Sequence, residues 1–191
     1  MIIDNWQITM VQNHSNKTNL VESIIERAVK YSIGPTTLRG QGIGVYKKSI
    51  ETIINIAKSP NFKTAITEID SDDKFQNFLN KETNKLKNKY LGYAKGNYGA
   101  ARKSWNLFFE QLYFDRILYE YFNIKKIEHY LEVPLDSKAA DFINNSNKIE
   151  WKGIKHLDHN TSNKFQKAAS EIAKNENIKR VELDLISWNN K

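Results

Sequence analysis

Cysteine is absent from this chain of 191 residues, which excludes a disulfide framework, cysteine-ligated zinc or iron–sulfur sites, and a cysteine nucleophile. Proline and glycine are scarce, at three and eight residues, so few positions interrupt regular structure. No apolar run is long enough to cross a bilayer, and the opening MIIDNWQITM lacks the basic flank and long apolar stretch of a signal peptide. We therefore expect a soluble, cytoplasmic protein with no membrane partner.

Acidic residues are outnumbered by basic ones, with 22 Asp and Glu against 29 Lys and Arg, which gives a formal net charge of +7 and a pI of about 9.3. This balance attracts acidic partners and favours nucleic acid among them. Hydrophobic residues make up 40% of the chain, enough for one core at this length. Because no repeat, low-complexity linker or change in composition marks a boundary, we expect residues 1–191 to form a single, monomeric domain.

Apolar residues recur mostly every three or four positions, which is the period of an amphipathic helix. The spacing predicts helices over 19–33, 45–58, 71–92, 100–122, 138–143 and 162–174. The first of these helices is expected to bury a stripe formed by Leu20, Ile24, Ala28 and Tyr31. Residues 181–185 alternate as a strand does, but no other segment offers a pairing partner. The prediction is an all-α fold, a single compact multi-helix domain.

Two segments are candidates for chemistry, GNYGAARKSWN at 96–106 and LEVPLDSKAADFI at 131–143. Glycines allow a turn to direct its backbone amides outward, and such a turn can bind a phosphate when positive charge is nearby. The residues at the first segment that would contact a DNA backbone are Lys95, Gly96, Asn97, Gly99 and Arg102. In the second segment, the order Pro-Leu-Asp-Ser places Asp136 at a helix start, where a purely structural cap is the competing interpretation.

The Gly-x-x-Gly turn entering a helix with Lys103 near its start, followed by Val-Pro-Leu-Asp with Asp136, resembles the helix-hairpin-helix DNA glycosylase superfamily over about residues 92–145. The 33 positions from Lys103 to Asp136 are closest to its archaeal-type 8-oxoguanine branch. The resemblance implies that the hairpin grips a DNA backbone and that Asp136 is the essential carboxylate. It also implies that Lys103 is the covalent nucleophile if the enzyme is a lyase as well, and that no metal or cofactor is needed. Ser137 matches the neighbourhood of the aspartate and is placed with the DNA contacts.

Base excision needs a pocket, since the target base must leave the DNA stack to reach the catalytic carboxylate. Candidate walls are Trp105 and Phe109, which follow the glycine turn, and Trp151; core packing is the competing interpretation. The loop TTLRGQGIG offers Arg39 and Gln41 for insertion into a duplex in place of a flipped base. An ordinary connection between helices would have the same composition.

The leading hypothesis is a DNA glycosylase that hydrolyses the N-glycosidic bond of a damaged or modified base in double-stranded DNA, for repair or antiviral defence. One alternative is a noncatalytic DNA-binding protein that uses the same hairpin and charge. Another is a Mg²⁺-dependent nuclease of the PD-(D/E)xK type, because Asp141, Glu150 and Lys152 have the spacing of its two carboxylates and lysine.

Overall fold

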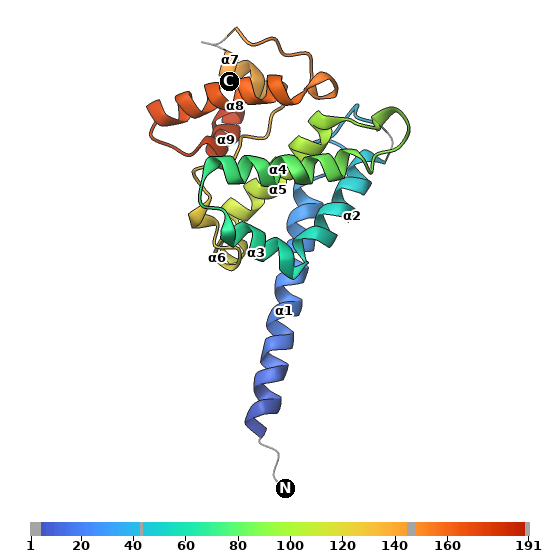
Figure 1. Cartoon of the computed structure of the whole chain (residues 1–191), viewed down its shortest axis with the longest axis vertical. Coiled ribbons are helices and arrows are strands. Elements are labelled where there is room, and N and C mark those ends of the chain that lie inside the picture. The colour runs from blue at the N-terminus through green and yellow to red at the C-terminus, as the bar shows by residue number, and fades with distance from the viewer. Residues whose placement is uncertain (1–4, 43, 145–147, 190–191) are drawn as a thin grey trace.

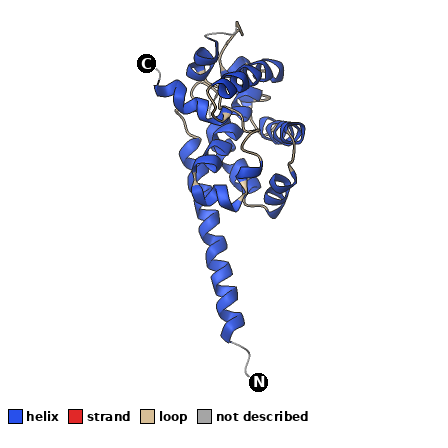
Figure 2. Cartoon of the chain, turned by 90° about the vertical axis from the view of Figure 1, so that its left-hand side faces the viewer, coloured by secondary structure: helices blue, strands red, loops and turns tan. Residues whose placement is uncertain are grey.

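The computed structural model describes residues 5–42, 44–144 and 148–189, and all regular structure in these ranges is helical, with no strand (Figures 1 and 2). The α-helices are α1 (Asn5–Ser32), α2 (Val45–Ala57), α3 (Pro60–Glu68), α4 (Asp72–Lys87), α5 (Tyr98–Phe114), α6 (Arg116–Tyr121), α7 (Ser137–Asn144), α8 (His159–Asn175) and α9 (Leu183–Asn189). Short 3₁₀ helices lie between them: η1 (Gly92–Ala94), η2 (Ile124–Lys126), η3 (Ile154–His156) and η4 (Arg180–Glu182). The prediction of an all-α, single compact domain is confirmed, whereas the helix-hairpin-helix glycosylase type stays a prediction. None of the described helices combines the length and apolar character of a membrane span.

Helix α5 is the centre of the larger of two cores, because α1, α2, α4 and α6 all pack against it. Every residue of α5 from Gly99 to Glu110 is buried. The rings of Trp105, Phe108 and Phe109 meet that of Phe62 from α3, with centroid distances of 6.1, 6.1 and 6.4 Å. Since a helix buried on all sides is held by its neighbours, α5 is a fixed platform for the polar side chains that it carries.

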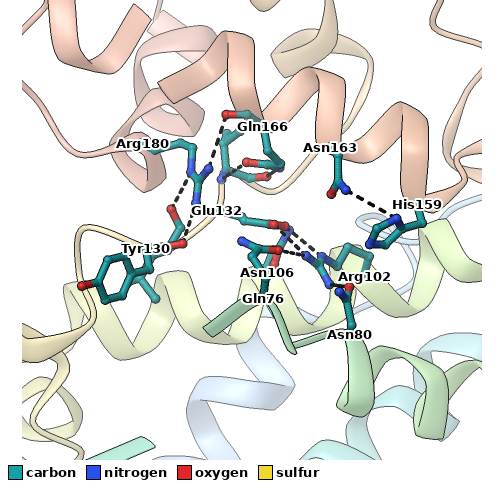
Figure 3. Close-up of polar contacts among 12 residues, drawn as sticks. Gln76, Asn80, Arg102, Asn106, Tyr130, Glu132, His159, Asn163, Gln166 and Arg180 are labelled. Carbon is teal, nitrogen blue, oxygen red and sulfur yellow. Dashed lines mark hydrogen bonds and ion pairs between the residues drawn. The ribbon is translucent and has the colours of Figure 1, made fainter. Parts of the chain in front are cut away.

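A second, smaller core lies among α7, α8 and α9. The segment 131–136 has no regular structure and connects the two cores. Gln166 of α8 holds this segment, because its amide donates to the carbonyl oxygen of Val133 at 2.8 Å and accepts from the N–H of Val133 at 3.2 Å (Figure 3). These two hydrogen bonds satisfy the buried backbone N–H and carbonyl groups of Val133, as pairing with a neighbouring strand would. Left without partners, these groups would cost folding free energy.

Arg180, at the start of η4, binds the chain just before that connecting segment. Its guanidinium donates to the carbonyl oxygens of Tyr130 at 2.5 Å and Leu131 at 2.9 Å (Figure 3). We call this set of contacts the Arg180 clasp. Because η4 leads directly into α9, the clasp places α9 where it packs against α7.

The long helix predicted over 100–122 is broken in the structure at Asp115, which has an extended backbone with ψ of 112°. Its carboxylate accepts hydrogen bonds from the N–H groups of Ile117 and Leu118 at 2.9 and 3.0 Å. Asp115 therefore caps a new helix, α6, with a change of direction. Pro60 similarly begins α3 rather than only ending α2, since proline fits the first turn of a helix.

Two further predictions need correction. The expected stripe of α1 is wrong at its ends, because Leu20 and Tyr31 are exposed. The buried face is instead formed by Val21, Ile25, Ala28, Val29 and Ser32. Residues 181–185 alternate in sequence but are helical, in η4 and α9. Val181 is buried in the larger core and Leu183 in the smaller one, and this burial of two apolar residues on one turn of helix explains the misleading pattern.

Candidate active site

Lys103 and Asp136, the two predicted catalytic residues, lie together in the structure. The Lys103 Nζ is 3.3 Å from the Asp136 Oδ2, although 33 positions separate the residues in sequence. Their side chains are 5% and 21% exposed, respectively. The pair therefore lies at the junction of the two cores, with the aspartate as the member more open to solvent.

The sequence around Asp136 explains how its carboxylate serves two partners. The chain is extended through residues 131–136, and α7 begins at Ser137. The Asp136 Oδ1 accepts from the N–H of Ala139 at 3.0 Å, which is the bond of a helix cap. The cap leaves Oδ2 to face Lys103. The structural interpretation of Asp136 and the functional one thus use different oxygens of one carboxylate.

Two carboxyl groups that the sequence reasoning missed, Glu110 and Asp184, belong to the same cluster. Glu110 follows Lys103 by seven positions, so the two side chains share one face of α5 two turns apart. Asp184 comes from α9, which packs on α7. The signal that could have found Glu110 is its place as a lone acid in the run WNLFFEQLYF; Asp184 stands in a pattern that resembled a strand.

Burial and neighbouring negative charge raise the pKa of both of these carboxyl groups. Burial, and then the charge of Asp184 and a hydrogen bond to it, raises the pKa of Glu110 to about 8. Burial, and then the charge of Asp136, raises the pKa of Asp184 to about 6, although Lys103 opposes the rise. At neutral pH, Glu110 is accordingly the protonated partner and donates to the Asp184 carboxylate. The Glu110 Oε1 is buried without a hydrogen-bond partner.

Arg102, predicted to contact DNA, requires a correction because its side chain is fully buried. Its Nε and Nη2 donate to the two carboxylate oxygens of Glu132 at 2.9 and 2.7 Å (Figure 3). Nη1 donates to Asn80 and Nη2 to Gln76, both at 2.8 Å. Asn106 donates to the same carboxylate at 3.0 Å. A guanidinium engaged in this way has a structural role and does not reach a phosphate.

The predicted pocket walls divide into two kinds. Trp105 and Phe109 are fully buried in the larger core, so their assignment to a base pocket is wrong and core packing is correct. Trp151 is half-buried, packs edge-on against Phe165 at 5.5 Å and donates from its indole Nε1 to the Ser137 Oγ at 3.4 Å. It lines a hollow of about 420 Å³ bounded by residues 148–153, 156–158, 161 and 164. Through this hydrogen bond with Trp151, Ser137 connects the edge of the hollow to Asp136, the residue that precedes it in the chain.

The hairpin residues are built into the fold to different degrees. Asn97 caps α5 by accepting from the N–H of Ala100 at 2.9 Å, and its amide donates to the Gln41 Oε1 at 3.1 Å. The Gln41 amide in turn donates to the carbonyl oxygen of Arg39 at 3.1 Å. Gln41 therefore ties two loops together, and its insertion into a duplex stays a prediction. The Arg39 side chain remains exposed.

Gly99 is required for close packing rather than for phosphate binding. A side-chain carbon at this position would lie 2.0 Å from the carbonyl oxygen of Ile154 in η3, so only glycine fits. This contact covers the backbone of Gly99, which corrects its assignment to a phosphate site. Lys95 and Gly96 are exposed, and Gly96 has a positive φ of 78°. The Gly96 N–H donates to the carbonyl oxygen of Lys87 at 3.3 Å, which corrects its assignment to a phosphate site. Of these two residues, the exposed Lys95 side chain is the one that can reach a partner.

The nuclease alternative finds no support in the fold. Asp141 lies on helix α7, and the described residues contain none of the paired strands on which PD-(D/E)xK enzymes place their acids. Glu150 and Lys152 form an exposed ion pair with each other at 3.1 Å. In the part of the chain that the structure describes, no three His, Asp or Glu side chains are grouped so that they could hold a metal ion.

Comparison of the chain with protein-family models, with curated proteins and with solved structures finds no match.

Proposed function

We propose that the protein is a DNA glycosylase that hydrolyses the N-glycosidic bond of a damaged or modified base in double-stranded DNA, acting as a cytoplasmic monomer. The observation that carries the proposal is the contact of Lys103 with Asp136 at 3.3 Å. The sequence motifs pair the same two residues for catalysis. The contact lies where a connecting segment joins two helical cores. Neither residue lines the hollow, which is linked to Asp136 through the hydrogen bond of Trp151 to the adjacent Ser137.

In this proposal Asp136 is the catalytic carboxylate. Loss of the base builds positive charge on the deoxyribose, which a nearby carboxylate stabilises, and the same carboxylate accepts a proton from the attacking water. The water oxygen then bonds to the sugar carbon, while the base leaves with the electrons of the broken bond. Since Asp136 is more exposed than Lys103, hydrolysis by water requires less rearrangement than attack by the lysine.

Lys103 has two possible roles in the same reaction. As an ammonium it holds the Asp136 carboxylate in place. If the enzyme is also a lyase, Lys103 transfers a proton to Asp136 and the neutral amine attacks the sugar carbon. The N-glycosidic bond then breaks, the base leaves with its electrons, and the lysine nitrogen stays bonded to the sugar as a covalent intermediate. Glu110 and Asp184 lie behind the pair and share one proton at neutral pH, so one further negative charge lies beside the Lys103–Asp136 pair.

The hollow beside Trp151 is the proposed place for the extruded nucleotide. It is large enough for a nucleobase, and Trp151 offers a ring for stacking. Three lysines at its border, Lys148, Lys152 and Lys164, provide positive charge for neighbouring phosphates.

Mass spectrometry of the free base tests the proposal directly. Duplexes carrying oxidised, alkylated, deaminated or phage-type modified bases are incubated with the protein in excess EDTA. We expect release from at least one duplex and its loss in Asp136→Asn. Asp141→Asn is the matched control, because Asp141 is an exposed aspartate on the same helix. Release that persists in Asp136→Asn would rule out the proposed role, and DNA binding without release would favour a noncatalytic DNA-binding protein.

A further inference from the structure

The loop between α4 and α5 presents two large apolar side chains to solvent. Leu91 is 80% exposed and Tyr93 is 100% exposed. Single apolar residues on a surface are common, but two within three positions on one short loop mark a contact surface. Neither residue was identified from the sequence.

The loop that carries them is anchored at both ends. Tyr90 is buried, and its hydroxyl lies 2.7 Å from the Ser49 Oγ. Ala94 is buried as well, against Gly42, where a side-chain carbon would approach the Ala94 Cβ to 3.3 Å. The exposed residues 91–93 thus lie between two buried anchors, which hold Leu91 and Tyr93 outward. A surface ordered in advance loses little entropy on binding.

Positive charge surrounds the two apolar side chains. Lys89 and Lys95 are exposed on either side of them. Arg39 is exposed on the neighbouring loop, which the hydrogen bond between Gln41 and Asn97 ties to this one. Two apolar side chains bordered by cations suit double-stranded DNA as a partner. The apolar side chains can contact the stacked bases while the cations contact the phosphate backbones on either side.

The loop is also continuous with the candidate active site. It leads into α5, where the Tyr98 ring packs edge-on against His159 at 6.1 Å and Gly99 touches Ile154. His159 begins α8 beside the hollow, and Lys103 lies one turn further along α5. Figure 1 shows the loop and the start of α8 on the same side of the molecule.

We propose that Leu91 and Tyr93 form an apolar wedge that enters double-stranded DNA and unstacks a base step, while Lys89, Lys95 and Arg39 contact the flanking phosphates. Proteins that kink DNA insert apolar side chains between base pairs in this manner. The inference rests on the proposed function only in taking duplex DNA as the partner. The wedge takes the place that the sequence assigned to Gln41, which is engaged in holding the two loops together.

The test measures binding and unstacking separately, with the full chain. A duplex with one stable abasic-site analogue next to a fluorescent adenine analogue reports affinity by anisotropy and unstacking by a rise in fluorescence. We expect the Leu91→Ala Tyr93→Ala variant to bind about tenfold more weakly and to lose the fluorescence rise. Its dependence on salt should be unchanged, because the phosphate contacts remain. Tyr93→Phe should behave as the native protein.

Ile117→Ala is the matched control, since Ile117 is an exposed aliphatic residue on α6, away from this loop in sequence. Circular dichroism of each variant verifies the fold. If the native protein binds the duplex and the double variant keeps both affinity and fluorescence rise, the wedge is wrong while DNA as a partner stands. If the native protein does not bind the duplex at all, the proposed function fails and the wedge fails with it.

Discussion

Adjacent residues of α5, Arg102 and Lys103, form two ion pairs of opposite character. Arg102 meets Glu132 with two hydrogen bonds, both side chains are essentially unexposed, and the amide oxygens of Asn80 and Gln76 accept from two further N–H groups of the guanidinium. Lys103 meets Asp136 through one contact of 3.3 Å, beside a carboxylate that is 21% exposed. The side chains at consecutive positions of a helix point about 100° apart. Arg102 and Lys103 therefore face different parts of the protein. The comparison indicates that a closed pair maintains the fold, whereas an open pair can exchange its partner for a substrate.

The largest expected effect comes from breaking the closed pair. Arg102→Met should cost about 3–5 kcal/mol of folding free energy, because it leaves the Glu132 carboxylate buried without its charge partner. Lys103→Met should cost on the order of 1 kcal/mol, because Asp136 keeps its cap bond and reaches solvent. Chemical denaturation of both variants measures the difference. Equal losses would contradict the distinction between the two pairs.

Asp136→Asn sharpens the comparison from the other side, by separating activity from stability. Base release should fall about 10²–10⁴-fold, the usual contribution of a positioned acid or base. Stability should change by less than about 1 kcal/mol, since asparagine caps a helix as well as aspartate does. Glu132→Gln should show the reverse order, with stability as its main loss. Release rates normalised to the folded fraction distinguish the two variants.

Glu132 and Glu110 should make the stability of the protein depend on pH in opposite directions. Although burial opposes it, the charge of Arg102 lowers the pKa of Glu132 to about 2, so the stability from this group is present above the ordinary value of 4.5 and is lost as pH falls toward 2. The raised pKa of Glu110, about 8, gives stability that is full below 4.5 and is lost as pH rises through 8.

Glu110→Gln tests the second half of that contrast, because glutamine resembles the protonated carboxyl. Between pH 5 and 8 the variant should lose less stability than the native protein, by up to about 1.4 kcal/mol per pH unit. Denaturant titrations at a series of pH values provide the measurement. A slope identical to that of the native protein would mean that Glu110 is ionised in the fold.

The smallest effect is expected at an exposed pair, Glu150 and Lys152. Their coupling in a double-mutant cycle should be about 0.2–1 kcal/mol and should weaken further in high salt. Because Glu150 also lines the hollow proposed for the nucleotide, strand cleavage rather than base release is the readout for the nuclease alternative. Activity that depends on Glu150 and is abolished by a chelator would instead support the nuclease alternative.

Local chemistry made much of the fold predictable. The helix predicted over 71–92 is present as α4, which Ser71 caps and which has acids in its first turn and lysines in its last. The break at Asp115 was not predictable from apolar spacing, because the pattern continues through it and only the competition of its carboxylate for two backbone amides ends α5. Leu20 and Tyr31 show a similar limit, since a helix of period 3.6 offers two adjacent stripes and tertiary packing selects one.

The residues of the candidate site could be predicted where they belong to sequence motifs. They could not be predicted where their position depends on how the helices pack. Lys103 and Asp136 were paired by their segments, and the structure brings them into contact. Arg102, Trp105 and Phe109 were misassigned because α5 is buried on all sides, a fact that depends on four neighbouring helices. Asp184 could not be found, since its approach to Glu110 depends on how α9 docks.

The Arg180 clasp sets the order in which the molecule can fold. Apart from Val181, the larger core is built from residues 21–131, whose helices follow one another along the chain. The clasp joins Arg180 to carbonyl groups 49 and 50 positions away, so it forms only after that long loop closes. Because Asp184 arrives with the same segment, a partly folded protein holds Lys103 and Glu110 in place without it. The candidate site is therefore complete only when α9 packs against α7, and it lacks Asp184 when α9 is detached.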